Sequence, residues 1–147
     1  MAADDPFDLE RFVAAQAPAI DAVRGELRRG RKTSHWMWFV FPQLADLGNS
    51  AMAKRYGLAS VAEARAYLAH PVLGPRLAEC CALLLQAPGD DIEEMLGHPD
   101  DLKFRSCLTL FIAARPSEEV FKQCLEKFYG GAPDERTVVL CWKSDGA

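Results

Sequence analysis

The stretch that decides the fold is GRKTSHWMWFVFPQ, residues 30–43. It begins with a basic turn and continues into a run of bulky residues, 36–42, that holds two of the chain's three tryptophans. Large apolar side chains are mostly buried in folded proteins, so we expect this run to lie in the interior. The polar residues before it, Lys32, Ser34 and His35, need water, a partner or a ligand. The sequence therefore predicts a buried aromatic segment with a polar rim.

The conformation of this run does not follow from its own pattern. Every residue is large and apolar, so neither a strand period nor a helix period is visible. Elsewhere, only residues 137–140 offer a row of β-branched side chains, and a single strand cannot satisfy its backbone hydrogen bonds. We therefore expect a short buried helix, capped by Thr33 or Ser34 and ended by Pro42.

Length and composition describe one ordinary globular domain. The 147 residues are 50% hydrophobic and 26% charged, which suits a single core, and no linker, repeat or low-complexity segment divides them. The net charge of -4 gives no general attraction to nucleic acid or to an anionic membrane surface, so any basic function must be local. We expect one domain over residues 1–147, with a frayed tail at 143–147.

The cysteines and the first residues indicate where the protein resides. The five cysteines are odd in number, lie in apolar contexts and form no C-x-x-C pair, which is typical of reduced thiols in a core. The first residues are acidic where a secretory signal is basic, and no apolar run approaches the roughly 18 residues of a membrane span. We expect a cytoplasmic protein that is neither exported nor membrane-inserted.

Capping residues and apolar faces divide the chain into about eight helices. The first starts at Asp5 or Asp8, is interrupted at Pro18 and ends at Gly30. The other helices are expected over residues 50–56, 61–69, 70–84, 90–97, 102–114, 117–128 and 134–141. The fold class is therefore all-α, a single compact multi-helical domain. The side chains expected to be substantially buried are Trp36, Trp38, Phe39, Phe41, Leu77, Leu84, Leu108 and Phe111.

Two polar features stand out along these helices. Five cations crowd the residues around Gly30, namely Arg24, Arg28, Arg29, Arg31 and Lys32. A charge run of this kind is usually a solvated helix end, although five cations exceed what capping requires. A polar stripe with members three residues apart is formed by Lys103, Ser106 and Thr109. It either faces solvent, which we favour slightly, or forms the wall of a pocket.

The sequence contains no strong catalytic motif. The histidines have no cysteine or carboxylate at ligand spacing, so no metal site is expected. Glycine-rich nucleotide motifs and a nucleophile elbow are also missing, so no cofactor is expected. His70 and His98 each precede a proline at a helix start and are interpreted as turn residues. His35 is equally consistent with a structural and a functional role.

Long motifs resemble a known family. They read G-x-K-x-SHWMWF-x-FPQ at residues 30–43, EA-x-AYL-x-HP-x-LG-x-RL at 63–77 and PDD-x-K-x-x-S-x-x-TLF at 99–111. Over nearly the whole chain they are similar to domain-of-unknown-function family 1810, bacterial and fungal proteins often labelled calpastatin. That label does not fit, because calpastatin is a disordered inhibitor, whereas a half-hydrophobic chain with well-capped helices must fold. The resemblance implies an all-α fold and supplies no activity.

Residues 63–68 and 101–112 also resemble, more loosely, the YbiA-like group. Members of that group cleave N-glycosidic bonds of phosphoribosyl and ADP-ribosyl compounds. The resemblance implies a pocket for a phosphorylated ribosyl or nucleotide-like molecule, with N-glycoside hydrolysis as the candidate reaction. Such a site needs cations for phosphate, an aromatic plane for a base and a carboxylate for the transition state.

The chain can supply each of these groups. The candidate ligand-binding residues are Arg31, Lys32, Ser34, His35, Trp36, Trp38, Lys103 and Ser106, and the candidate catalytic carboxylates are Glu63, Asp100 and Asp101. We expect Lys32, His35 and Lys103 to face one cavity walled by Trp36. The cations would repel one another unless an anion, water or a carboxylate such as Asp100 or Asp101 separated them.

Two other interpretations use the same residues. The protein could be a non-enzymatic module that binds a small molecule or a protein partner, or the aromatic run could be core and the function lie elsewhere. A cleft that joins the predicted cations to a carboxylate favours the glycosidase, and a cleft without the carboxylate favours a binding module. The absence of a cleft leaves only a structural role. The sequence predicts neither the ligand nor the oligomeric state.

Overall fold

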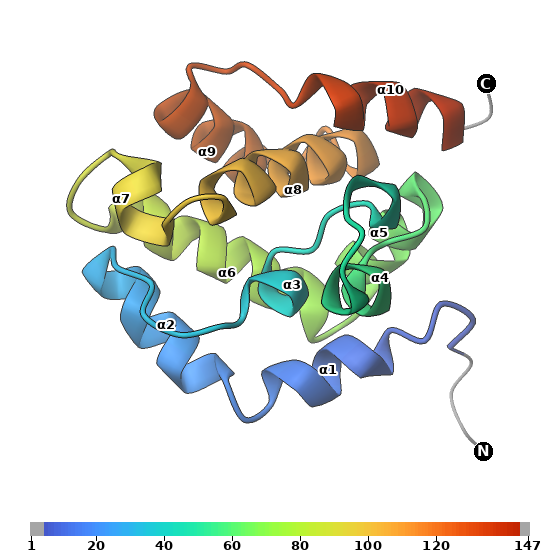
Figure 1. Ribbon diagram of the computed structural model, residues 1–147, viewed down its shortest axis with the longest axis horizontal. Helices are drawn as coiled ribbons and strands as arrows, with labels where there is room; N and C mark the ends of the chain where they lie inside the picture. The colour runs from blue at the N-terminus through green and yellow to red at the C-terminus, as the bar shows by residue number, and fades with distance from the viewer. Residues whose placement is uncertain (1–4, 145–147) are drawn as a thin grey trace.

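The computed structural model describes residues 5–144, which contain ten α-helices and one 3₁₀-helix (Figure 1). In chain order they are α1 (Glu10–Gln16), α2 (Ile20–Arg29), α3 (Met37–Val40), η1 (Ala45–Leu47), α4 (Ala51–Tyr56), α5 (Val61–Ala69), α6 (Leu73–Gln86), α7 (Ile92–Leu96), α8 (Asp100–Ala114), α9 (Glu119–Tyr129) and α10 (Glu135–Ser144). Within this range the β-structure is one isolated parallel bridge between Leu44 and Leu58. The predicted all-α class is confirmed, with ten α-helices where about eight were expected.

The two longest helices, α6 and α8, occupy the centre of the fold. α8 packs against α5, α7, α9 and α10, and α6 packs against α2, α5 and α9. In Figure 1, α1 and α2 lie along one side of the molecule and α10 along the opposite side. The buried residues of α6 recur at helical spacing, at Leu73, Leu77, Cys80, Cys81 and Leu84, which explains its central position.

α5 and α6 are joined by a sharp bend of 90°. Gly74 permits it, because a Cβ at this position would lie only 2.0 Å from the carbonyl oxygen of Leu68. His70 supports the turn as expected, since its Nδ1 accepts from the backbone N–H groups of Val72 and Leu73. Among the described residues no single helix has the length and apolarity of a membrane span, although this bent pair reaches them when taken together.

The aromatic run forms the short helix α3, as predicted. Trp36 and Phe41 are each only 1% exposed, and the other predicted core residues on α6 and α8 are also buried. Trp38 and Phe39 are only partly buried against the core, so their predicted burial was too strong. The reason is geometric: successive side chains of a helix point in different directions, and a single helical turn cannot bury all of them.

Most predicted helix ends are confirmed. Side-chain oxygens cap the helices at Ser50, Ser60, Asp91 and Asp134, and Gly30 ends α2 with a φ of 69°. Asp5 is not the N-cap of α1, but its carboxylate accepts from the backbone N–H groups of Leu9 and Glu10 just before and at the start of that helix. Other predicted helix starts were wrong. No side chain caps α8, which begins at Asp100 and not at residue 102. No side chain caps α3, because Ser34 bonds to Glu26 instead, and none caps α9, which begins after Glu118 and not at Ser117. α10 continues to Ser144, and residues 145–147 of the predicted frayed tail lie outside the described residues.

All five cysteines are buried in the core, and none forms a disulfide. Burial raises the pKa of Cys80 to about 12 and raises the pKa of Cys81 and Cys107 well above their ordinary value. Since the thiolate is the reactive form, these three thiols are chemically quiet. They serve as small apolar side chains, as the sequence predicted.

Candidate functional site

Two lysines from distant segments converge on one carboxylate. Lys32 lies in the loop after α2, and its Nζ is 2.9 Å from Asp100 Oδ2. Lys103 lies one turn into α8, and its Nζ is 3.7 Å from Asp100 Oδ1. The Lys32 side chain is only 9% exposed, so water screens the Lys32–Asp100 pair much less than it screens a surface pair. We call Lys32, Asp100 and Lys103 the lysine–aspartate cluster.

Each lysine of the cluster also lies over a tryptophan ring. Lys32 Nζ is 5.2 Å from the ring centroid of Trp36, and Lys103 Nζ is 5.5 Å from that of Trp38. Both distances lie in the range of cation–π attraction. The cluster holds two positive charges and one negative charge, and Asp100, one of the separating groups considered from the sequence, pairs with both lysines. The fold therefore concentrates an excess positive charge beside two aromatic planes.

Glu26 organises the loop that carries Lys32. Its carboxylate is buried, with the residue 4% exposed, and accepts four hydrogen bonds. Oε1 accepts from the backbone N–H groups of Thr33 (2.7 Å) and Ser34 (3.0 Å) and from Trp36 Nε1 (3.0 Å), and Oε2 accepts from Ser34 Oγ (2.5 Å). Burial alone would raise the pKa of Glu26. The hydrogen bonds outweigh this effect and lower the pKa to about 2.

The position of Glu26 in the sequence indicates its burial. Glu26 follows Val23 by three residues and precedes Leu27, so it lies on the buried face of α2. A carboxylate on an apolar face needs donors, and the hydroxyls, indole and free backbone N–H groups of residues 33–36 supply them.

The loop is held at a second point, because the backbone N–H of Lys32 donates to the carbonyl of Met95 (2.8 Å).

The other predicted rim residues are less engaged with the cluster. Arg31 and His35 are exposed on the same loop. The hydroxyl of Ser34 is committed to Glu26, and that of Ser106 donates to the carbonyl of Leu102 at 3.2 Å. Ser106 and Thr109 are buried, so the polar stripe on α8 does not face solvent, contrary to the slightly favoured expectation.

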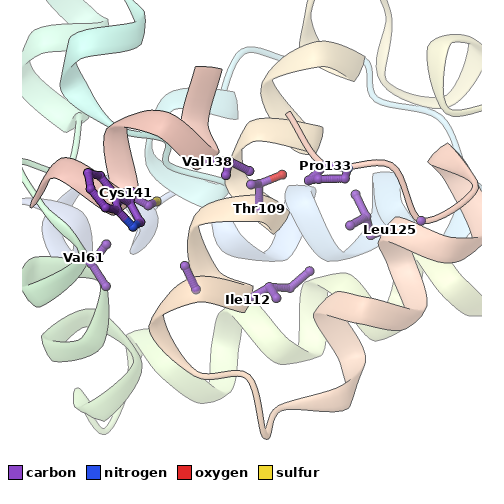
Figure 2. A pocket seen from close by; sticks show the side chains of 10 residues that line it. Val61, Thr109, Ile112, Leu125, Pro133, Val138 and Cys141 are labelled. Carbon is purple, nitrogen blue, oxygen red and sulfur yellow. The ribbon is translucent and has the colours of Figure 1, made fainter. Parts of the chain in front are cut away.

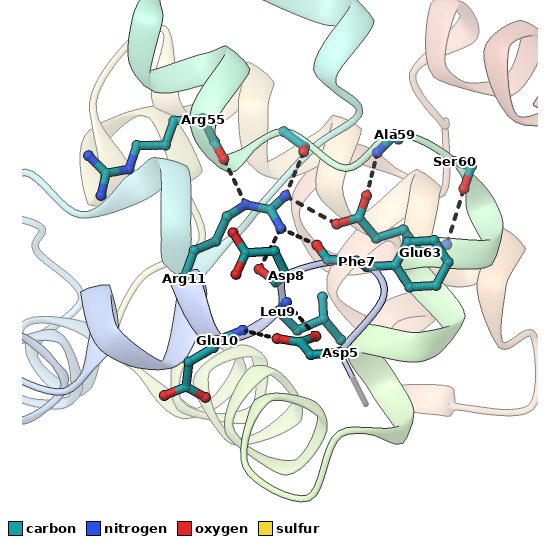
Figure 3. A network of polar contacts seen from close by, with 11 residues as sticks. Asp5, Phe7, Asp8, Leu9, Glu10, Arg11, Arg55, Ala59, Ser60 and Glu63 are labelled. Atoms are coloured by element: carbon teal, nitrogen blue, oxygen red, sulfur yellow. Dashed lines mark hydrogen bonds and ion pairs between the residues drawn. The ribbon is translucent and has the colours of Figure 1, made fainter. Parts of the chain in front are cut away.

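The three candidate carboxylates have different surroundings. Asp100 is the one that contacts the predicted cations. Asp101 pairs with His98, whose Nδ1 is 2.9 Å from Asp101 Oδ1. Glu63 belongs to a network between α1 and the start of α5, where Oε1 accepts from Ala59 N–H (2.8 Å) and Oε2 from Arg11 Nη2 (3.1 Å) (Figure 3). Glu63 therefore joins two helices, whereas Asp100 pairs with both lysines of the cluster.

The cavities differ from the predicted arrangement. Lys103 and Trp38 line a cavity of about 10 Å³, which has room for about one water molecule. A pocket of about 710 Å³ lies elsewhere, between α8, α9 and α10 (Figure 2). Neither cavity is lined by Lys32, His35 or Trp36, so the prediction that Lys32, His35 and Lys103 face one cavity walled by Trp36 is wrong. Neither of these cavities is the predicted cleft that would join the cations to a carboxylate. Among residues 5–144 no group of three His, Cys, Asp or Glu side chains could hold a metal ion.

The buried state of Glu26 predicts a pH-dependent stability. Its folded pKa of about 2 lies below the ordinary 4.5, so its contribution is present above pH 4.5 and is lost as the pH falls toward 2. A lowering of this size corresponds to about 3 kcal/mol. Urea unfolding at several pH values should therefore show that Glu26→Gln loses about 3 kcal/mol at pH 6 and progressively less below pH 4.5. Glu94→Gln, at an exposed carboxylate, is the control, and equal pH profiles for the two variants would contradict the assignment.

Comparison with known proteins identifies the family. The crystal structure of the conserved hypothetical protein Rv1873 from Mycobacterium tuberculosis is similar to this chain with a TM-score of 0.92. The two sequences are 56% identical, and the match covers 94% of this chain and 99% of that one. The comparison with curated proteins finds no match. The family model described as "Protein of unknown function (DUF1810)" matches residues 6–141, so this chain belongs to the DUF1810 family, as its motifs predicted.

Proposed function

We propose that the lysine–aspartate cluster binds the phosphate of a small phosphorylated metabolite. The observation that carries this proposal is the convergence of Lys32 and Lys103 on a single carboxylate. One carboxylate neutralises only one of the two ammonium groups. A phosphate dianion that displaces Asp100 neutralises both and accepts stronger, charge-assisted hydrogen bonds. In the free protein Asp100 keeps the two lysines together until the ligand replaces it.

The aromatic neighbours indicate which part of the ligand lies beyond the phosphate. Trp36 is buried and its indole N–H donates to Glu26, so its ring is fixed beneath the ammonium group of Lys32 and cannot stack on a ligand. Trp38 is partly exposed beside Lys103 and offers a ring face to a nucleobase or a sugar. Arg31 and His35, exposed on the loop, are the side chains that could extend toward the rest of the ligand. A phosphorylated riboside has this combination of groups.

A binding experiment tests the proposal. Ribose 5-phosphate and ADP-ribose should raise the melting temperature, since a ligand at 100 times its dissociation constant stabilises by about 2.7 kcal/mol. Lys32→Ala and Lys103→Ala should each weaken binding by about 1.5 to 3 kcal/mol in titration calorimetry. Asp100→Asn should tighten binding, because it removes the competing charge.

Lys122→Ala is the matched control for Lys103→Ala. Lys122 also lies on a helix and pairs with a carboxylate three residues earlier, Glu119. It should leave the affinity unchanged. If Lys103→Ala and Lys122→Ala lost the same affinity, the effect would come from the net charge of the protein and not from the cluster. If the wild-type protein did not bind either ligand, the proposal would be wrong.

N-glycoside hydrolysis is a second candidate function, favoured by the position of Asp100. It is the one candidate carboxylate next to the proposed phosphate site, where it could stabilise positive charge developing on a ribosyl ring. Chromatography of ADP-ribosyl and phosphoribosyl N-glycosides incubated with the protein tests this reaction. Asp100→Asn should abolish release of the base while it preserves binding. Binding without release in the wild-type protein would leave the non-enzymatic binding module.

A further inference from the structure

An apolar pocket beside α10 is separate from the lysine–aspartate cluster. Its volume is about 710 Å³, within the range of pockets that hold small molecules. Thr109, Ile112 and Ala113 of α8 line one part of it, Leu125 of α9 another, and Val138 and Trp142 of α10 a third (Figure 2). Together with Val61 at the start of α5, these three helices surround a space that α10 leaves unfilled.

The chemistry of the lining selects against charged ligands. None of the described residues that line the pocket carries a charge. The one hydroxyl, Thr109 Oγ1, donates to the carbonyl of Arg105 (2.8 Å) and accepts from the backbone N–H of Asp134 (3.0 Å). Apart from the indole N–H of Trp142, the lining side chains therefore offer a polar ligand group no strong partner in place of its water, which costs free energy.

Two apolar side chains on the α10 side of the pocket are exposed to solvent. Trp142 is 72% exposed and Val138 is 45% exposed, and both line the pocket. Exposed large apolar side chains that gather beside a pocket are a mark of a binding surface. A ligand that fills the pocket would cover them and remove apolar area from water.

We propose that this pocket binds an uncharged, mainly hydrocarbon small molecule. The size of the site favours a small molecule over a protein partner. Ten residues line the pocket, whereas a stable protein interface uses roughly 20 to 30 residues on each side. The absence of lining charge favours a neutral ligand over a fatty acid or a nucleotide. This site is independent of the phosphate site proposed above.

The neutral fluorescent probe N-phenyl-1-naphthylamine tests the proposal on the full chain. The wild-type protein should bind it with a rise in fluorescence, and a neutral long-chain alcohol should displace it. Val138→Arg places a cation in the pocket wall and should weaken binding at least tenfold. Val139→Arg is the matched control, since Val139 is the next residue of α10, is 53% exposed and does not line the pocket, and its affinity should stay within about twofold of wild type.

A second variant guards against misfolding of the first. Ala113→Trp adds a ring at an exposed position of the pocket and should reduce binding by filling the space while circular dichroism stays helical. Lys103→Ala should leave probe binding unchanged, which separates this site from the phosphate site. No binding by the wild-type protein, or equal binding by Val138→Arg and Val139→Arg, would overturn the proposal. It would also be overturned if sedimentation showed a wild-type dimer that Val138→Arg dissociates, because the occupant would then be a second copy.

Discussion

Trp36→Ala is expected to lower the free energy of unfolding by about 3 to 5 kcal/mol, as measured by urea denaturation near pH 7. Trp36 is 1% exposed, and its ring centroid lies 6.0 Å from that of Phe41. Removal of the indole leaves a large cavity at the start of α3. It also takes one of the four hydrogen bonds from the buried carboxylate of Glu26, which adds to the cost.

Trp38→Ala is the matched control, since Trp38 lies two residues away in the same run. It is only partly buried, so we expect a loss of about 1 to 2 kcal/mol. Trp36→Phe keeps most of the apolar volume and loses the indole N–H, which separates packing from the hydrogen bond to Glu26. If Trp36→Ala cost less than about 1 kcal/mol, the aromatic run could not be the centre of the core.

The fold was predictable because its determinants are local. Ser50, Ser60 and Gly30 mark helix ends through the conformations and hydrogen bonds that their own side chains or backbone allow. The aromatic run is also predictably buried, because its large apolar side chains are unfavourable in water. The sequence of the run does not predict that Trp38 and Phe39 stay partly exposed, since this depends on the orientation of α3 in the fold.

The polar interior was not predictable to the same degree. Arg11 looks like a solvent-facing charge of an amphipathic helix, and its placement depends on acceptors far along the chain, at Arg55, Gly57 and Glu63. The apolar face of α2 indicates the burial of Glu26, but it does not specify that residues 33–36 of the following loop supply its donors. The approach of Lys32 to Lys103 followed from the expectation that both segments pack on one core. In the structure both lysines pair with Asp100, whereas an open cleft was expected. This pairing depends on side-chain conformations, which sequence patterns do not specify.

The apolar pocket beside α10 was missed for a related reason. Val138 and Trp142 fit the amphipathic pattern of a core-facing helix, and a pattern of this kind does not report how closely the helix approaches its neighbours. Pro133 and Asp134 fix where α10 starts, and Asp134 binds Thr109 on α8. The helix is thereby anchored at its first turn, while its later side chains Val138 and Trp142 remain largely exposed beside the pocket.

Arg11→Ala is expected to destabilise the protein by about 3 to 5 kcal/mol in urea denaturation. The guanidinium uses all five of its N–H donors. It donates to the carbonyls of Phe7 (2.6 Å), Asp8 (2.8 Å), Arg55 (2.7 Å) and Gly57 (3.1 Å) and to the carboxylate of Glu63 (3.1 Å) (Figure 3). Arg11→Lys should recover only part of the loss, because an ammonium group cannot reproduce this planar set of donors.

The partner charge explains why the loss is large and how to test that explanation. Glu63 is buried, and without Arg11 its carboxylate keeps the N–H of Ala59 but loses its counter-charge. Glu63→Gln in the Arg11→Ala background should therefore restore at least about 1 kcal/mol, whereas Glu63→Gln alone should destabilise. Arg28→Ala, at an exposed arginine of α2, should change stability by no more than about 0.5 kcal/mol. If the double variant were as unstable as the sum of the two single variants, the cost would lie in the lost carbonyl bonds of Arg11 and not in a buried unpaired charge.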